Sequence, residues 1–235
     1  SLHDALPILA YPVTLLPDTF PYADTLTYNP KNLQGDLRLS SIYKLRTVEQ
    51  ASSSVSNSMQ TCYKYLNDHV TLYRLQYVYL RYAEALNRAG YPQSAFAVLK
   101  HGLWKDNIEK YISAEERAAA GDLISFSEYT FTRNNTQGIH SRGCGRADAD
   151  TTYVIPQLST LADSILFVED KICDEMALET AAEGQRFYDL MRLSLHRNDV
   201  TFLADKVARR NDPANRDEEL FTKLSNKKNW YLPLE

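Results

Sequence analysis

Cysteine is scarce in this sequence, and its spacing does not suit a metal site or a disulfide framework. The 235 residues hold only Cys62, Cys144 and Cys173, an odd number without a CxxC pair. Such a set predicts neither a zinc site nor a disulfide scaffold. The five histidines are scattered, and none stands in HExxH spacing. We therefore expect no bound metal and no cofactor.

Long hydrophobic runs and an excess of basic residues are also lacking. No run of about 18 apolar residues occurs, so no membrane-spanning helix is expected. The net charge of −4 disfavours nucleic acid as a partner, because no basic excess is available to replace phosphate counterions. With 44% hydrophobic and 24% charged residues, the chain has an ordinary globular composition.

The first nine residues do not resemble a secretory signal. The chain begins with Ser1, and its first residues lack the basic region of a secretory signal. We expect a fragment that is truncated at the N-terminus, and leave open that the extreme N-terminus is partly foreign. Five prolines fall within residues 1–35, which predicts an irregular segment there and a second region over 36–235.

Helical periodicity begins near residue 70 and predicts a helical hairpin over about 70–104. Gly90 is placed to end the first helix, and Pro92 to open the second. The first apolar stripe comprises Leu72, Leu75, Tyr79, Tyr82, Ala83 and Leu86, and the second comprises Ala95, Val98, Leu99 and Leu103. This spacing is typical of two antiparallel helices packed through small residues, as in one tetratricopeptide-like hairpin.

Residues 105–168 form a variable region of long loops. A short helix is expected over 108–120, with Ser113 as its N-cap and Glu116 three residues later. A glycine-rich stretch follows at 138–146. Its His140 and Arg142 suit either hydrogen bonding to a polar ligand or anchoring of the loop.

The most informative stretch is 172–192, for which we predict a single amphipathic helix within a signature helix of about 169–197. Its charged residues step by three or four positions, and Gly184 would lie mid-helix. The set comprises Glu175, Glu179, Glu183, Arg186, Asp189 and Arg192. Three interpretations are open: a solvated helix face, a structural network that ties the helix to a neighbour, and a catalytic carboxylate pair.

The remaining segment, about 198–235, forms a C-terminal tail. A short helix is expected over 200–207, ended by the Asn211-Asp212-Pro213 run. Near the chain end, Trp230 and Tyr231 are expected to dock on the helical core, as large aromatic rings do.

Several phrases of this sequence resemble, in order, those of the SusD/RagB family of outer-membrane nutrient-binding lipoproteins. The run from Glu175 to Arg192 resembles the family's C-terminal signature, with Met176 where Arg is common. The other phrases are Asp36-Leu37-Arg38, the run 82–90 (YAEALNRAG), the run 138–145 (GIHSRGCG) and the terminal run 229–234.

The resemblance implies a mainly α fold of tetratricopeptide-like hairpins with long irregular loops. It also implies a non-catalytic protein at the outward face of the outer membrane, held by an N-terminal lipid anchor. Such a protein captures glycans for a SusC-like TonB-dependent transporter. Four residues are candidates for ligand contact from residue type and loop location, namely Trp104, Tyr129, His140 and Arg142. The alternatives are a glycoside hydrolase that uses Glu175 and Glu179, and a helical scaffold that binds only proteins.

Overall fold

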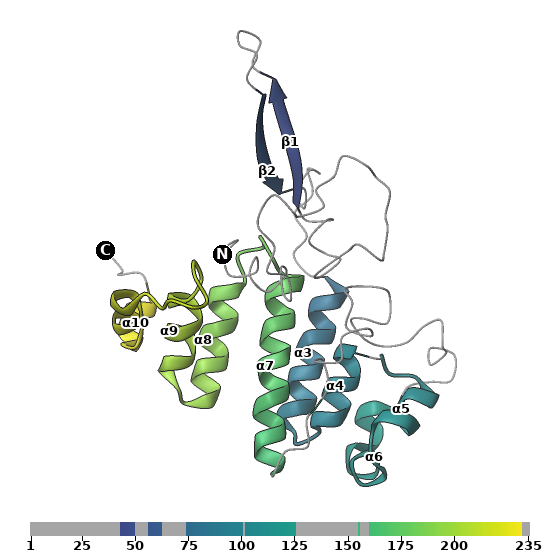
Figure 1. The fold of residues 1–235 in the computed structure, drawn as a ribbon. Coiled ribbons are helices and arrows are strands. Elements are labelled where there is room, and N and C mark those ends of the chain that lie inside the picture. Colours follow the sequence, from purple (N-terminus) through teal and green to yellow (C-terminus); the bar gives the residue numbers. More distant parts are fainter. Residues whose placement is uncertain are drawn as a thin grey trace. The chain divides into compact units, whose positions relative to one another are not determined.

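The computed structural model describes residues 43–49, 56–62, 74–100, 102–125, 155 and 160–231. Within these residues the chain is mainly α-helical (Figure 1), which confirms the predicted fold class. The chain divides into two compact units. Unit 1 comprises Ser1–Gln34, Leu39–Lys64 and Met176–Glu235, and unit 2 comprises Gly35–Arg38 and Tyr65–Glu175. The irregular segment predicted over 1–35 lies outside the described residues.

One two-stranded antiparallel sheet accompanies the helices. Strand β1 (Tyr43–Glu49) pairs with β2 (Ser56–Cys62), and the register runs from Tyr43 opposite Cys62 to Glu49 opposite Ser56. The sequence predicts β2 only weakly, because only Met59 and Cys62 among its seven residues are apolar. Its strand pattern is correspondingly weak.

The predicted helical hairpin is present in unit 2 as α3 (Leu75–Arg88) and α4 (Pro92–Lys100). Gly90 adopts a left-handed φ of +94°. Its N–H donates to the Asn87 carbonyl at 3.1 Å, and the N–H of Tyr91 donates to the Leu86 carbonyl at 3.0 Å. This pair of bonds is the Schellman motif. Pro92 then occupies the first position of α4, where its missing N–H has no helical partner to lose.

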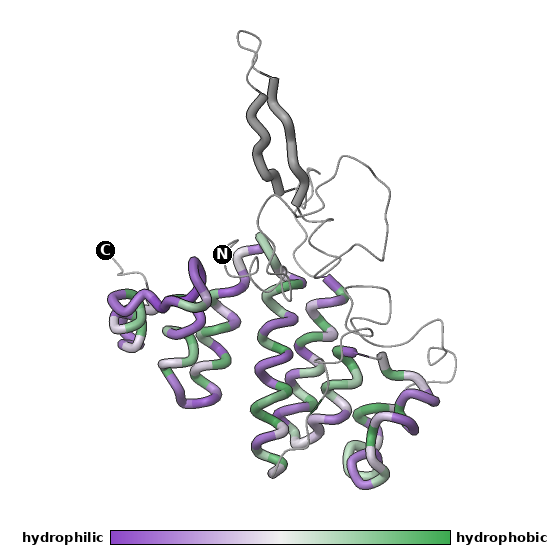
Figure 2. The backbone as a smooth tube through the Cα atoms, viewed as in Figure 1, coloured by the Kyte–Doolittle hydropathy of each residue, from purple (hydrophilic) through white to green (hydrophobic). Residues whose placement is uncertain are grey.

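The core of unit 2 lies between α3 and its neighbours. Leu80, Ala83 and Leu86 are buried on α3, whereas Leu75 is exposed. Helix α4 is buried at every position except Gln93. Helix α7 (Leu161–Glu179) lies beside α3, because Asn87 donates from Nδ2 to the Ile165 carbonyl at 2.8 Å (Figure 1). Polar and apolar residues alternate along α3 and α7 in Figure 2, as amphipathic helices require.

The first part of the variable region, residues 105–124, is more regular than predicted. The expected helix over 108–120 is two helices, α5 (Lys105–Tyr111) and α6 (Ala114–Ala120), followed by the 3₁₀ turn η2 (Gly121–Ile124). The break between them falls at Ile112 and Ser113, which are both extended. Ser113 caps α6 as predicted, since its side chain accepts from the Glu116 N–H at 3.2 Å.

A reciprocal pair of caps fastens α6 to α4. Instead of bonding back to Ser113, the Glu116 carboxylate accepts from the N–H and the hydroxyl of Ser94, both at 2.7 Å. It also accepts from the Gln93 N–H at 3.2 Å. In return, the Gln93 side chain accepts from the Ser113 N–H at 2.7 Å. Each helix thus satisfies N–H groups at the start of the other.

A second link joins η2 to α3. The Tyr82 hydroxyl donates to the Leu123 carbonyl at 2.5 Å. Burial raises the pKa of Tyr82 to about 12, so this hydroxyl remains a donor at all physiological pH values.

The predicted signature helix over 169–197 is wrong as a single helix. Helix α7 ends at Glu179, and α8 (Arg186–Arg197) begins after a turn. Ala182 and Gly184 adopt φ values of +67° and +75°, which a right-handed helix does not admit. Thr180 closes the last turn of α7, since its hydroxyl donates to the Met176 carbonyl at 2.6 Å. Gly184 therefore lies in the turn, not mid-helix as predicted.

The tail of the chain continues as helices. Asn198, with a left-handed φ of +53°, ends α8, and Asp199 caps α9 (Val200–Ala208). This confirms the short helix predicted over 200–207. The buried Ser194 of α8 accepts from the Leu203 N–H at 3.0 Å. That bond supplies a partner to an N–H in the first turn of α9 and fixes the two helices together.

The last described elements are α10 (Glu218–Leu224) and the 3₁₀ turn η5 (Lys227–Trp230). Trp230 is buried, and its indole N–H donates to the Leu224 carbonyl at 2.6 Å, so it docks on the helices as predicted. The prediction for Tyr231 is wrong, because its side chain is exposed.

Candidate functional site

The acidic and arginine residues of the signature run are mostly buried. Glu175 and Asp189 are each 2% exposed, and Glu179 and Arg186 are each 5% exposed. Surface ion pairs would leave such side chains in water. The solvated-face interpretation is therefore wrong for these four residues. Glu183 is half-buried and Gly184 is exposed, since both belong to the turn between α7 and α8.

The described contacts of this set are one ion pair and one contact to sulfur. Arg192 donates from Nη2 to Asp189 Oδ1 at 3.0 Å within α8. The same nitrogen lies 3.7 Å from the sulfur of Met176. Met176 is fully buried, and through this contact it links the end of α7 to α8. Buried charges are tolerated only when they are paired and hydrogen-bonded, so the buried Asp189 carboxylate depends on Arg192 as its partner.

A matching network lies in unit 2, between α3 and α7. Arg88 donates to Glu84 at 3.1 Å and to Glu169 at 2.7 Å. Both carboxylates are buried, whereas the Arg88 side chain is 28% exposed. This network was not predicted from the sequence. The signal that could have found it is the pair of opposite charges, Glu84 and Arg88, four positions apart in the 82–90 phrase.

The positions of Glu175 and Glu179 do not suit a catalytic carboxylate pair. A glycosidase needs two carboxylates that flank a substrate pocket. Glu175 and Glu179 are both buried, so a glycosidic bond could not reach them without rearrangement of the helix end.

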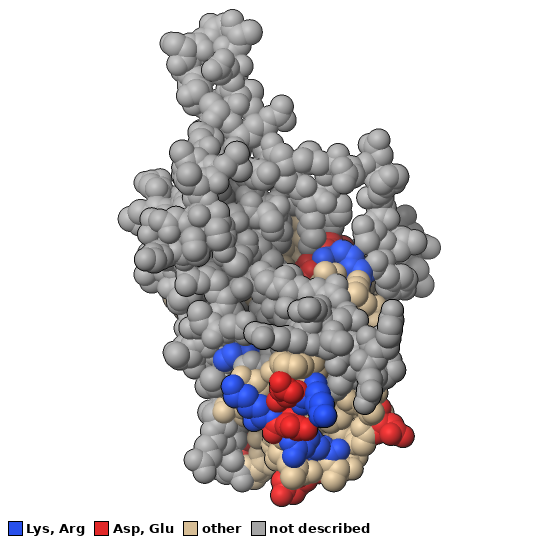
Figure 3. Space-filling view, turned by 90° about the vertical axis from the view of Figure 1, so that its right-hand side faces the viewer, with Lys and Arg blue, Asp and Glu red and all other residues tan. Residues whose placement is uncertain are grey.

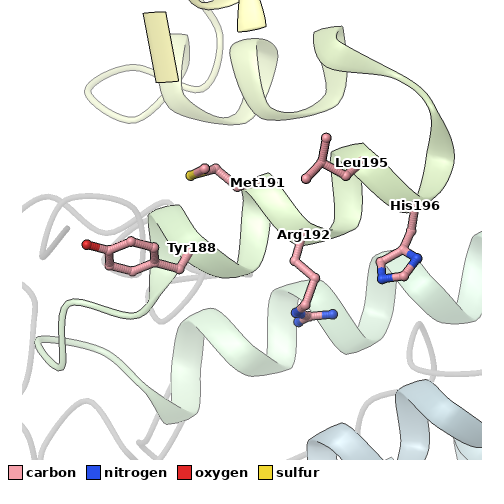
Figure 4. Close-up of a pocket in the computed structure, with 5 residues that line it drawn as sticks. All are labelled: Tyr188, Met191, Arg192, Leu195 and His196. Atoms are coloured by element: carbon pink, nitrogen blue, oxygen red, sulfur yellow. The ribbon is translucent and has the colours of Figure 1, made fainter. Parts of the chain in front are cut away.

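Among the described residues, an open groove lies along α8 and has a volume of about 520 Å³. Its lining comprises Tyr188, Met191, Arg192, Leu195 and His196. Figure 4 shows Met191 and Leu195 on one edge of α8 and Arg192 and His196 on the other, with Tyr188 toward one end. One rim of the groove is therefore apolar and the other is polar.

Comparison with known families gives a match over most of the chain. The family model described as the SusD family matches residues 41–235. The chain belongs to the SusD family. Membership implies a nutrient-binding protein of the cell surface, with glycans among the ligands of the family. Neither the curated proteins nor the solved structures give a match to this chain.

The SusD match places the buried charged cluster inside the family region, but it does not assign a ligand site. Of the four residues predicted to contact ligand, the structure describes only Trp104. It is half-buried and stands immediately before α5. Tyr129, His140 and Arg142 lie outside the described residues, so their proposed roles stay predictions.

The surface of the described helices carries no strong charge of one sign on the face seen in Figure 3. There, basic and acidic side chains alternate over the described residues. On α5 and α6 the exposed residues include Lys105 and Lys110, and also Asp106 and Glu115.

The described helices and turns also bear on metal binding and on membrane insertion. No group of three His, Cys, Asp or Glu side chains is placed there to hold a metal ion. No helix there combines the length and the apolar character that a membrane crossing demands.

Proposed function

We propose that this protein captures glycans, or other nutrients, at the cell surface without breaking bonds. It passes them to a SusC-like TonB-dependent transporter of the outer membrane. The observation that carries the proposal is the SusD family match over residues 41–235. The outer-membrane location, the N-terminal lipid anchor and the transporter partner are parts of the same proposal.

The burial of the acidic cluster supports a binding role over a hydrolytic one. The carboxylates best spaced for hydrolysis, Glu175 and Glu179, are buried, so they are available for packing helices and not for proton transfer to a glycan. Tyrosine supports the choice of glycans as ligands, because it is abundant, with 16 copies. Its ring can stack on a sugar while its hydroxyl stays in water.

The first test is retention of the intact protein in native gels that contain starch, xylan, galactan or mannan. We expect slower migration in at least one of these gels than in a gel without polysaccharide. Bovine serum albumin serves as the non-binding control protein, and it should migrate equally in all gels. Unchanged mobility of the protein with every polysaccharide would contradict the glycan-binding proposal.

The second test concerns the transporter. We expect affinity-tagged protein, solubilised from its native outer membrane, to co-purify with a TonB-dependent transporter in stoichiometric amount. Co-purification without any retention by glycans would favour the alternative of a scaffold that binds only proteins. Absence of the transporter would contradict the partnership but leave the glycan proposal standing.

A further inference from the structure

Helix α8 has apolar residues on two faces, of which packing explains only one. Leu190 and Leu193 are fully buried and account for the inner face. On another face, Tyr188 is 68% exposed and Leu195 is 44% exposed. The outer face of an amphipathic helix is ordinarily polar. Tyr188 and Leu195 line the same groove, and a groove that combines apolar and polar side chains is the kind of surface that binds small ligands.

The groove places three polar or aromatic groups in a row. Tyr188, Arg192 and His196 stand at every fourth position of α8, so successive residues rise by about 6 Å along the helix axis. That step is comparable to the length of one pyranose residue. Arg192 is held in place by Asp189 at 3.0 Å, so little side-chain freedom remains to be lost when a ligand binds.

We propose that this groove is a saccharide subsite, an inference that rests on the proposed function. The exposed face of Tyr188 stacks on the C–H face of one sugar ring. Arg192 and His196 hydrogen-bond the hydroxyls of the next rings along the row. Met191 and Leu195 on the opposite rim contact the less polar edge of the chain (Figure 4). Because the groove is open, it receives an internal stretch of an oligosaccharide in preference to a single sugar.

A protein partner fits this surface less well. A stable protein interface buries roughly 800 Å² on each partner, with an apolar, water-excluded centre. The α8 groove offers one tyrosine and one leucine as its strongly exposed apolar side chains, and a polar rim lies within it. Aromatic rings combined with a few placed polar groups are instead the composition of a small-ligand site.

The test compares affinities for the polysaccharide that retains the wild-type protein in native gels. Tyr188→Ala should weaken retention about tenfold, since the stacking contact is lost. Tyr188→Phe keeps the ring and should stay within about twofold of wild type. Tyr231→Ala is the matched control, because Tyr231 is also an exposed tyrosine but does not line the groove. It should leave retention unchanged.

Each outcome decides the proposal. Equal retention by wild type and Tyr188→Ala, with the same melting temperature, overturns the subsite but leaves the proposed function intact. Retention by neither protein overturns both. If Tyr188→Ala keeps glycan retention and loses co-purification with a membrane protein, the groove is a protein contact and the saccharide proposal fails.

Discussion

Arg88 and Glu169 stand 81 positions apart in the sequence and form an ion pair of 2.7 Å between α3 and α7. The same arginine also pairs with Glu84, one turn earlier on α3, at 3.1 Å. One guanidinium therefore pairs with two buried carboxylates from two helices, and Glu84 also pairs with Arg81 at 3.3 Å. The 82–90 phrase, YAEALNRAG, thus contains both the end of the hairpin helix and the cation that joins it to α7.

Replacing this cation should destabilise the protein strongly. Arg88→Met would keep much of the side-chain volume but leave Glu84 and Glu169 buried without their shared partner. We expect a loss of about 3 kcal/mol in the free energy of unfolding, measured by urea denaturation. Arg209→Met is the control, because the Arg209–Asp205 pair is more than a third exposed on both sides. Its loss should be below about 1 kcal/mol. Equal effects of the two substitutions would contradict the account of the network.

The reciprocal caps between α4 and α6 give a second prediction. Glu116→Ala removes the acceptor for Ser94 and Gln93 at the start of α4. Loss of a helix cap lowers stability by about 1–2 kcal/mol. Glu115→Ala, at the exposed neighbouring position, should change the unfolding midpoint little. If both variants unfold at the same urea concentration, the Glu116 bonds contribute no measurable stability.

The turn between α7 and α8 makes a paired prediction. Ala182→Gly should stabilise the protein by about 0.5 kcal/mol. The substitution removes the strain of a left-handed φ at alanine. This gain exceeds the loss of stability that glycine causes by raising the conformational entropy of the unfolded chain. Gly184→Ala should destabilise it by roughly 1 kcal/mol, because alanine would be strained at the left-handed φ of this position. An added Cβ at Gly184 would meet no atom within 4 Å, so backbone strain alone is tested. Thermal melting of both variants checks these opposite signs.

This turn also shows how far the sequence could be interpreted alone. The α3–α4 hairpin was predictable because Gly90 and Pro92 carry specific backbone requirements. The break after Glu179 was not, because charged residues keep helical spacing from Glu175 to Arg192 straight through the turn. The left-handed φ of Ala182 could not be predicted, because alanine is common in helices and the sequence pattern at this position is that of a helix.

The candidate site was only partly predictable for a related reason. A charged stripe has the same spacing on a solvated helix as on a buried one, so the sequence left three interpretations open. Burial excludes the solvated helix face for Glu175, Glu179, Arg186 and Asp189. The α8 groove was missed because Tyr188 and Leu195 have the spacing of an apolar core face, and only their exposure reveals that nothing among the described residues covers them.

Stability should depend on pH through Asp199, the N-cap of α9. Its carboxylate accepts from the Thr201 hydroxyl at 2.6 Å and the Thr201 N–H at 2.9 Å. These bonds, led by the hydroxyl, hold the pKa of Asp199 below its ordinary value of 3.8. A lowered folded-state pKa stabilises the protein above the unfolded value, and this stabilisation is lost as pH falls through the folded value.

Asp199→Asn should therefore be less stable than wild type at pH 7. The difference should shrink as the pH falls below 3.8, the ordinary value, because the wild-type carboxyl becomes neutral too. Urea midpoints of both proteins at pH 7, 5 and 3 provide the measurement. A gap that is constant over this range would show that the Asp199 charge is not involved.

The central claim is that the buried acidic cluster supports the fold and performs no chemistry. The most direct measurement is release of reducing sugar from a polysaccharide that retains the intact protein, made on wild type and Glu179→Gln with the free energy of unfolding of each. We predict no sugar release by either protein and a clearly less stable Glu179→Gln, since Glu179 is buried. Sugar release by wild type that disappears in an equally stable Glu179→Gln would contradict the account.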